Sequence, residues 1–232
     1  AAWIAFIAGR RADGQPIIRG FGATSTTGAA LRWTRDLLVA TAEGDVSASY
    51  DALTRQAAEV EPGADGLFFL PHLMGERGPQ HDPMARGGLI GLTLHHGRPH
   101  VIRAVLEGTA YHLRRLLEAR IADRWPRGSG PKSGVACGGA ARSELWMQVL
   151  ADVTGLEYRM PVVVEAGALG AAILGGAAVG LLSLDTAPAA LVRFARTYRP
   201  DATLGARYDR IYKRYCELDD LLAPWFRAGD AE

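Results

Sequence analysis

An α/β fold is the class that this sequence predicts, and two observations support it. First, short apolar runs bounded by glycine or proline, which are typical of strands, alternate with longer segments of helical spacing. Second, the later half of the chain gives the order strand, helix, strand, helix, which favours a sheet with parallel pairing. The length of 232 residues, a mean hydropathy near zero and short connections are consistent with one large globular domain.

The first part of the chain is expected to combine strands and helices. Apolar runs mark the strands, and apolar residues three or four positions apart mark the helices. The expected order is a strand over residues 3–8, a turn at Asp13-Gly14, a strand near Ile17, helices over 27–40 and 50–60, and a buried strand over 66–70.

Residues 71–97 differ in character because they are rich in glycine and proline and hold four of the six histidines. Loops of this length inside a compact domain are usually functional or part of an interface. A long amphipathic helix is expected to follow over residues 98–122. Its expected core face is Val101, Val105, Thr109, His112, Leu113 and Leu116.

The second half supplies the alternation on which the fold class depends. After a turn-rich break over residues 125–132, each strand is followed by a helix. The expected elements are a strand over residues 133–137, a turn over 138–142, a helix over 143–154, a strand over 157–160, and helices over 167–179, 186–196 and 207–224.

Charge and cysteine usage exclude several classes of partner and site. Lys and Arg number 26 against 25 Asp and Glu, so neither a nucleic-acid surface nor an acidic-membrane surface is indicated. Cys137 and Cys216 are far apart and have no metal-ligand spacing, which predicts reduced thiols in a cytoplasmic protein.

Residues 166–184 form an uncharged stretch long enough to cross a bilayer. The stretch is rich in Gly and Ala rather than Leu and Ile, and Glu165 and Asp185 flank it, so a closely packed helix outside a membrane is the better interpretation. The small residues at its start, 166–172, would also let the helix approach another backbone or a bound ring.

The stretch Cys137-Gly138-Gly139-Ala140-Ala141-Arg142-Ser143 is the most suggestive chemically. Glycines allow a ligand to approach the backbone, and the N-terminus of the helix that follows offers unpaired N–H groups. Ser143 is placed either to cap that helix or to bind a ligand. The pattern is neither a dinucleotide fingerprint nor a P-loop, so from the local pattern alone an ordinary strand–helix crossover is the favoured interpretation and a ligand site is the alternative.

The histidines and carboxylates give no clear catalytic or metal site. His95 and His96 are adjacent, but no spacing matches a zinc signature, so no metal site is predicted. The carboxylates near the Gly-rich loop, Glu76, Asp82 and Glu107, could act as bases. Because Arg77, Arg86 and Arg103 lie close in sequence, structural ion pairs are the favoured interpretation.

Taken together, these segments resemble the FGGY family of carbohydrate kinases, with xylulokinases nearest and glycerol and gluconate kinases next. The matching segments are GAALRWTRD at residues 28–36, GERGP at 75–79, DPMARG at 82–87, GGLIGL at 87–92, HVIRAVLE at 100–107, GGAARSELW at 138–146 and ALGAA at 168–172.

The resemblance implies a ribonuclease H-like (actin/hexokinase-type) ATPase lobe, a mixed sheet flanked by helices. The whole chain, residues 1–232, would be the C-terminal nucleotide-binding lobe of a sugar kinase. It also implies an ATP site. Its expected members are Gly28, Arg32, Gly138, Gly139, Ala140 and Ser143, with the reservation that glycerol kinases have glutamine where this chain has Arg32.

Other parts of the kinase are expected outside this chain. The family's catalytic aspartate and its main phosphate loop belong to an upstream region, so the resemblance implies no catalytic residue here and an inactive chain when isolated. The expected cofactors are ATP and Mg²⁺. The expected partners are the N-terminal sugar-binding lobe and a sugar, for which D-xylulose is the prediction. A homodimer, a different sugar, sugar acid or polyol, and a silent nucleotide-binding regulatory module stay open as alternatives.

Overall fold

The computed structural model describes residues 4–10, 16–21, 24, 26–38, 46–78, 81–122 and 130–229. In chain order the elements are β1 (Ile4–Arg10), β2 (Pro16–Phe21), α1 (Gly28–Leu38), α2 (Val46–Ala58), η1 (Ala64–Gly66), β3 (Phe68–Leu70), β4 (Gly88–Ile90), α3 (Arg98–Ala122), β5 (Ser133–Val135), η2 (Gly139–Arg142), α4 (Glu144–Thr154), β6 (Glu157–Pro161), α5 (Ala166–Ala178), α6 (Ala187–Leu191), β7 (Phe194–Tyr198) and α7 (Gly205–Ala228).

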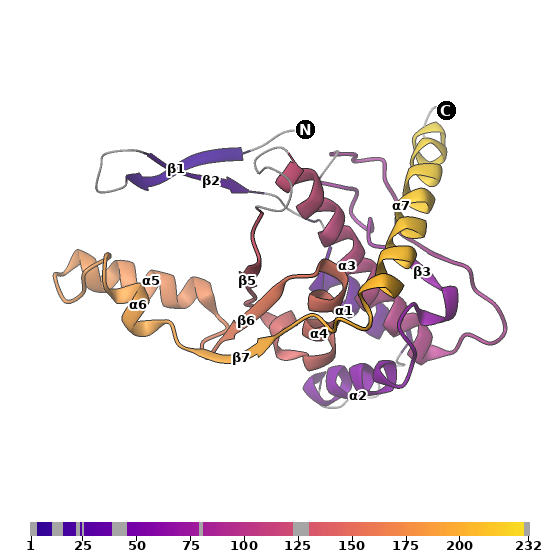
Figure 1. Ribbon diagram of the computed structural model, residues 1–232, viewed down its shortest axis with the longest axis horizontal. Helices are drawn as coiled ribbons and strands as arrows, with labels where there is room; N and C mark the ends of the chain where they lie inside the picture. Colours follow the sequence, from indigo (N-terminus) through magenta and orange to yellow (C-terminus); the bar gives the residue numbers. More distant parts are fainter. Residues whose placement is uncertain are drawn as a thin grey trace.

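The elements divide into a packed body and two projections. Helices α1, α2, α3, α4 and α7 gather with β3 on one side of the molecule, whereas the β1–β2 hairpin and the helices α5 and α6 extend to the other side (Figure 1). The predicted α/β class is confirmed, but the strands form separate sheets of two, two and three strands. The predicted turn at Asp13-Gly14 lies outside the described residues.

Helix α3 is the centre of the body, and its bounds are those predicted. It contacts β3, α1, α2, α4 and α7, and every residue from 102 to 112 is buried. The amphipathic pattern expected for this helix is therefore wrong over residues 102–112, because a stretch of helix that is covered on all sides has no solvent face. Of the expected core face, Val101 and Leu113 are only half-buried.

A short strand interrupts the segment that was predicted to be a continuous loop. Residues 88–90 pair antiparallel with β3, so that Phe68 lies opposite Ile90 and Leu70 lies opposite Gly88. The strand is only three residues long, and the glycines around it hide its apolar run. Its partner β3 is fully buried, as predicted, but the strand is shorter than the predicted range 66–70, because Gly66 is exposed and belongs to η1.

The three-stranded sheet has the order β5-β6-β7 and is mixed. Strand β5 pairs parallel with β6, as the alternation predicted, and β7 pairs antiparallel with β6. The helix predicted over residues 186–196 is wrong in its second half, where α6 ends and β7 follows. Pairing with β6 and burial of Tyr198 beside Tyr158 outweigh the local helical spacing of this short segment.

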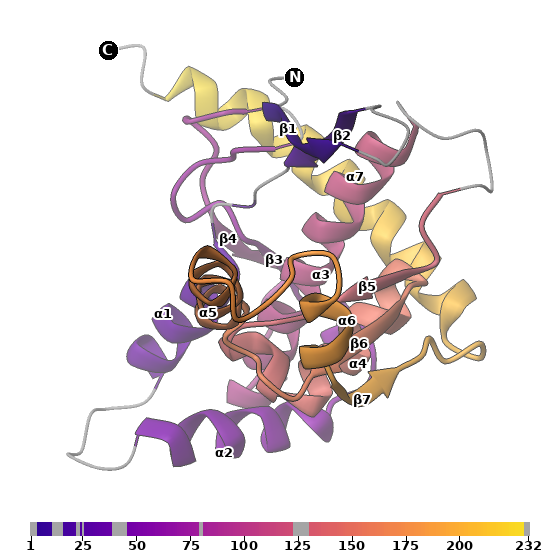
Figure 2. The same cartoon turned by 90° about the vertical axis from the view of Figure 1, so that its left-hand side faces the viewer.

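The remaining helices agree with the predictions except at their ends. Helix α2 begins four residues before the predicted start at Tyr50. Helix α7 continues past the predicted end, and Pro224 lies inside it, although proline usually ends a helix. Figure 2 shows α7 running across the back of the body toward the C-terminus.

Helix α5 differs from the prediction of close packing. Ile173 is its one buried residue, and Leu174 is 62% exposed. In the described part of the chain, therefore, this apolar helix has little to pack against. We refer to α5, α6 and the residues between them as the arm. No helix among the described residues has the length and apolar character needed to span a bilayer.

Candidate nucleotide site

The turn after β5 has a backbone conformation that requires glycine at position 138. Gly138 has φ 83° and ψ −177°, a region of backbone conformation that essentially only glycine adopts. Its N–H donates to the Val164 carbonyl oxygen at 2.8 Å, which ties the turn to the segment between β6 and α5. One turn of 3₁₀-helix, η2, then leads into α4.

The space beside the turn is open. A Cβ atom added at Gly138 or at Gly139 would meet no atom within 4 Å, and Gly139 is exposed. A flat ring or a phosphate can therefore approach this backbone without obstruction from a side chain. The ordinary-crossover interpretation explains the conformation of Gly138, but it gives no reason for a second glycine at a position where a Cβ would fit.

Ser143 caps α4, as one of the two interpretations predicted. Its hydroxyl oxygen accepts from the Trp146 N–H at 3.3 Å, which satisfies one of the unpaired donors of the first turn. A hydroxyl that accepts one hydrogen bond keeps its own proton for another. The cap and a ligand contact are therefore compatible at this residue.

Packing in the core brings α1 close to the glycine turn and the start of α4. Leu31 of α1 and Trp146 of α4 share one buried cluster, and Ala140 packs against it. The Trp146 indole N–H also donates to Thr109 Oγ1 of α3 at 3.2 Å. Gly28 and Arg32 are exposed on α1, so the structure joins the elements that carry all six predicted residues.

An open cavity of about 870 Å³ lies between α2 and the start of α4. Arg55, Arg142 and Ser143 are among its lining residues. Ser143 is the one member of the predicted set that lines it, so the cavity adjoins the predicted site rather than coinciding with it. Arg55 was not predicted, because its position on a separate helix gives no sequence signal.

The buried carboxylate Glu107 has a structural role. It accepts from Arg103 Nε at 2.7 Å, from the Tyr208 hydroxyl at 3.0 Å, from the Tyr111 hydroxyl at 3.1 Å and from the Gly63 N–H at 3.0 Å. Burial and the Glu107 charge raise the pKa of both tyrosines. The predicted ion pair with Arg103 is confirmed, and a fully bonded carboxylate is unsuited to act as a base.

Asp82 is also ion-paired, but with an unexpected partner. Its Oδ2 lies 2.7 Å from Arg227 Nε near the end of α7. Burial opposes ionisation, but the bonds from Arg227 and from the Met84 N–H hold the pKa of this carboxyl below its ordinary value. The sequence had instead indicated an arginine close in the chain, such as Arg77 or Arg86, as the ion-pair partner. Glu76 pairs with Asp82 through backbone hydrogen bonds.

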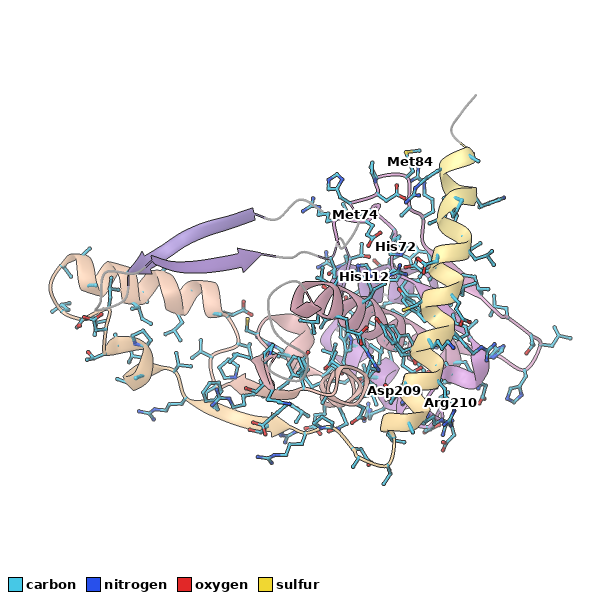
Figure 3. All side chains as sticks on the ribbon, turned by 45° about the horizontal axis from the view of Figure 1, so that its top comes forward. His72, Met74, Met84, His112, Asp209 and Arg210 are labelled. Atoms are coloured by element: carbon cyan, nitrogen blue, oxygen red, sulfur yellow. The ribbon has the colours of Figure 1, made fainter. Side chains whose placement is uncertain are left out.

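Two histidines from distant segments meet beneath the Gly-rich loop. His72 and His112 lie with ring centroids 5.0 Å apart (Figure 3), and His72 Nε2 is 2.9 Å from Asp219 Oδ1. Burial first, and His72 second, lower the pKa of His112 to about 4. Both rings are nearly inaccessible to solvent, so this cluster belongs to the core.

Comparison with known proteins decides the family. Residues 11–179 match the C-terminal domain of the FGGY family of carbohydrate kinases, which is well over half of the chain. The chain belongs to the FGGY family of carbohydrate kinases. The resemblance carried by the glycine turn, the α3 signature and the ALGAA helix is thereby confirmed.

Named relatives and solved structures agree with this assignment. The chain is 39% identical over 184 residues to a gluconokinase of Bacillus subtilis, covering 77% of this chain and 34% of the relative. It is 35% identical over 191 residues to a glycerol kinase of Shewanella sediminis, covering 82% and 36%. The chain thus spans about a third of the curated relatives that it matches.

Solved structures extend the comparison to the fold. The xylulose kinase of Rhodospirillum rubrum superposes with a TM-score of 0.71 at 35% identity, covering 90% of this chain and 41% of that protein. The gluconate kinase of Lactobacillus acidophilus gives 0.77 at 27% identity, covering 95% and 42%. The predicted actin/hexokinase-like fold is confirmed.

Proposed function

We propose that this chain is the nucleotide-binding half of an ATP-dependent sugar kinase, which transfers the γ-phosphate of ATP to a sugar hydroxyl. The observation that carries the proposal is the Gly138-Gly139 turn, which leaves open space beside the backbone at the N-terminus of α4. Phosphoryl transfer depends on positioning and charge stabilisation, and this chain would contribute the nucleotide side of that arrangement.

The residues present fit ATP. The turn residues Gly138, Gly139 and Ala140 would lie against the nucleoside, and Ser143 would donate a hydrogen bond. Gly28 and Arg32 would lie near the phosphates, where the guanidinium is a suitable partner. ATP would supply the phosphoryl group, and these residues would bind and orient it.

The described residues do not fit a Mg²⁺ site. Within the ranges that the structure covers, the grouping of three metal-ligating side chains is Asp65, His95 and His100. Two imidazoles do not match the all-oxygen shell that Mg²⁺ prefers. The Mg²⁺ that the family implies is therefore expected to be held by the nucleotide and by parts of the kinase other than these residues.

The exposed arm supports the proposal of an N-terminal lobe as partner. Leu174, Val179 and Leu181 are 62%, 71% and 80% exposed. Apolar surface grouped on one projection marks an interaction site. Added Cβ atoms at Gly167 and Gly170 meet nothing within 4 Å, so the small residues leave room for a close neighbour. We propose that the sugar-binding lobe, which would carry the catalytic aspartate, covers the arm.

The sugar is the open part of the proposal. D-xylulose is our prediction, and xylulose kinase is the name of one solved relative. Gluconate is the second candidate because a gluconokinase is 39% identical to this chain, and glycerol is the third. A coupled kinase assay of the full-length protein with these three acceptors would rank them by kcat/KM. Turnover with none of them, together with intact ATP binding, would favour the silent regulatory module.

Substitution of Gly139 tests the nucleotide site directly. In the full-length protein, Gly139→Val should raise the KM for ATP by roughly tenfold or more, about 1.4 kcal/mol, because the branched side chain enters the open space. Gly139→Ala should have a smaller effect. Gly205→Val is a matched control, because an added Cβ there also meets nothing within 4 Å. An unchanged ATP affinity in Gly139→Val would rule out this assignment.

A further inference from the structure

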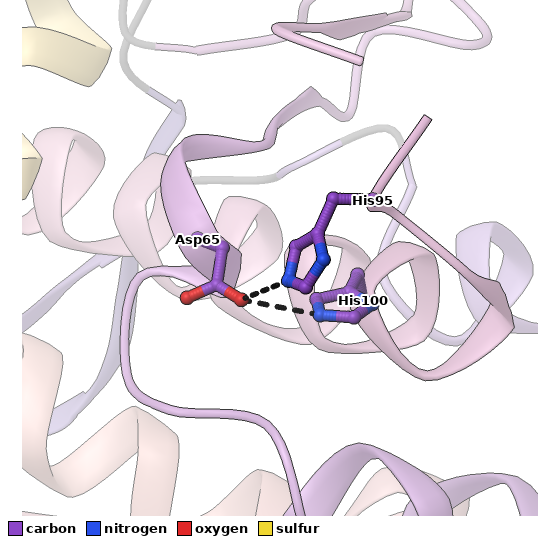
Figure 4. A group of neighbouring side chains, drawn as sticks. All are labelled: Asp65, His95 and His100. Atoms are coloured by element: carbon purple, nitrogen blue, oxygen red, sulfur yellow. Dashed lines mark hydrogen bonds and ion pairs between the residues drawn. The ribbon is translucent and has the colours of Figure 1, made fainter. Parts of the chain in front are cut away.

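Three polar side chains from separate segments converge on one face of η1. Asp65 lies in η1, His100 lies in the first turn of α3, and His95 lies in the loop between β4 and α3. His95 Nε2 is 3.5 Å and His100 Nε2 is 3.2 Å from the same oxygen, Asp65 Oδ2 (Figure 4). All three ligand atoms lie within 4.8 Å of one another.

The backbone at this point is shaped to bring these groups together. Ala64 and Asp65 have φ 47° and 52°, a left-handed conformation that is unfavourable for residues other than glycine. The bonds from Gly63 N–H to Glu107 hold the turn in place. At Gly91, with φ 97°, an added Cβ would lie 2.7 Å from the Gly66 carbonyl oxygen. Glycine therefore lets the loop that carries His95 pass directly against the turn.

The spacing and donor types suit a transition metal. In a tetrahedral zinc site with bonds of about 2.1 Å, neighbouring ligand atoms are about 3.4 Å apart. The two distances to Asp65 Oδ2 bracket that value. Two imidazoles and one carboxylate are ligands for Zn²⁺ and its neighbours in the transition series rather than for Mg²⁺.

Accessibility favours entry of an ion with water as a fourth ligand. The His95 side chain is 74% exposed and that of Asp65 is 43% exposed, whereas His100 is 17% exposed on a rigid helix. We propose that Asp65, His95 and His100 form a binding site for a divalent transition metal ion of the zinc type, separate from the nucleotide site. The ion would join the loop of residues 91–97 to η1.

Hydrogen bonding around His100 limits the strength of the site. The Gly97 N–H donates to His100 Nδ1 at 3.1 Å, so the ring proton lies on Nε2 and is donated to Asp65 Oδ2 at 3.2 Å. A metal ion at Nε2 requires the ring proton to move to Nδ1, so the bond that Nδ1 accepts from the Gly97 N–H must break. Binding should therefore be weaker than at a four-ligand structural zinc site.

His96 provides the matched control. Its ring centroid lies 6.1 Å from that of His95 and 5.4 Å from that of His100. However, its Nδ1 accepts from the Thr93 N–H at 2.9 Å, and its Nε2 faces the Asp65 carbonyl oxygen at 3.4 Å. It is a neighbouring imidazole outside the three-ligand set, so its removal should leave the metal affinity almost unchanged.

Titration calorimetry of the 232-residue chain with ZnCl₂, and separately with MgCl₂, tests the proposal. The exposed Cys137 is replaced by Ser throughout, so that its thiol does not contribute. We expect one Zn²⁺ per chain and no heat with Mg²⁺. His95→Ala should weaken Zn²⁺ binding at least tenfold, and His96→Ala should change it less than threefold.

Two further measurements make the outcome unambiguous. Asp65→Asn keeps a residue type that tolerates the left-handed conformation and removes the charge, so it should weaken binding like His95→Ala. Co²⁺ added to the chain with Asp65, His95 and His100 intact should give the intense visible absorption of a tetrahedral site. Equal Zn²⁺ affinity in His95→Ala, equal losses in His95→Ala and His96→Ala, or no Zn²⁺ binding at one equivalent would each overturn the proposal.

Discussion

The body around α3 and the arm of α5 and α6 show opposite relations between sequence and burial. Helix α3 contains Arg103, Glu107 and His112, yet every residue from 102 to 112 is buried. Helix α5 is almost entirely apolar, yet it buries only Ile173. Hydrophobicity along the chain therefore does not locate the core of this domain.

The difference lies in what each region supplies for itself. The body satisfies its buried charge internally, since Glu107 receives donors from α3, α7 and the turn before β3. The arm has no counterpart surface among the described residues, and added Cβ atoms at Gly167, Gly170 and Gly175 would meet nothing within 4 Å. We infer that the body is stable in isolation, whereas the arm depends on a partner surface, for which the N-terminal lobe is the proposal above.

The largest expected effect comes from breaking the network in the body. Glu107→Gln leaves the Arg103 guanidinium buried without a counter-charge, which should lower the free energy of unfolding by about 3–5 kcal/mol. Urea unfolding measures the change. Glu118→Gln is the control, because Arg114 and Glu118 form the same i,i+4 pair with the Glu118 side chain 52% exposed, where about 0.5 kcal/mol is expected. Similar losses in both variants would contradict the contrast.

The buried His112 should make the body sensitive to acid. Its folded pKa of about 4 is below the ordinary value of 6.5, so its contribution to stability is complete above pH 6.5 and is lost as the pH falls toward 4. The full difference corresponds to about 3 kcal/mol. The groups around it are His72, Asp219 and Arg115.

His112→Gln checks this expectation. Its free energy of unfolding should fall less between pH 6.5 and 4.5 than that of the unmodified chain, whatever its stability at neutral pH. The carboxyl of Asp219 has a lowered pKa and so titrates below this window. Parallel pH profiles for the two proteins would show that His112 does not dominate the acid response.

A pair of glycine substitutions compares the two regions at a smaller scale. In α3, a Cβ at Gly108 would lie 2.2 Å from the Phe69 carbonyl oxygen, so Gly108→Ala should destabilise the chain by about 1–3 kcal/mol. In α5, Gly170→Ala meets nothing within 4 Å and should be neutral or stabilising by less than about 1 kcal/mol. Thermal unfolding of both variants measures this, and a destabilising Gly170→Ala would mean that the arm is packed.

Much of the fold could be predicted because its signals are local. The bounds of α3 and the order β5, η2, α4, β6, α5 follow from periodicity and glycine placement, and the Ser143 cap follows from its position. Strand β7 could not be predicted, because its state depends on pairing with β6. Strand β4 was missed because three residues between glycines carry too weak a pattern.

The candidate sites, like the fold, could be predicted only in part. The six predicted nucleotide residues could be named from the family resemblance, but only the structure brings α1 and the glycine turn to one buried cluster around Trp146. The cluster of Asp65, His95 and His100 had no sequence signal. Its members are 30 and 5 positions apart, and a left-handed turn brings them together.

The sequence by itself determined the family, the helix-forming segments and the glycine turn, because these depend on residue type and short-range spacing. The tertiary structure decided which surfaces are buried: it placed a charged helix at the centre and left an apolar helix outside. The physical reason is that burial depends on partners. A charge can be buried where other segments supply its hydrogen bonds, and an apolar face stays exposed where no surface covers it.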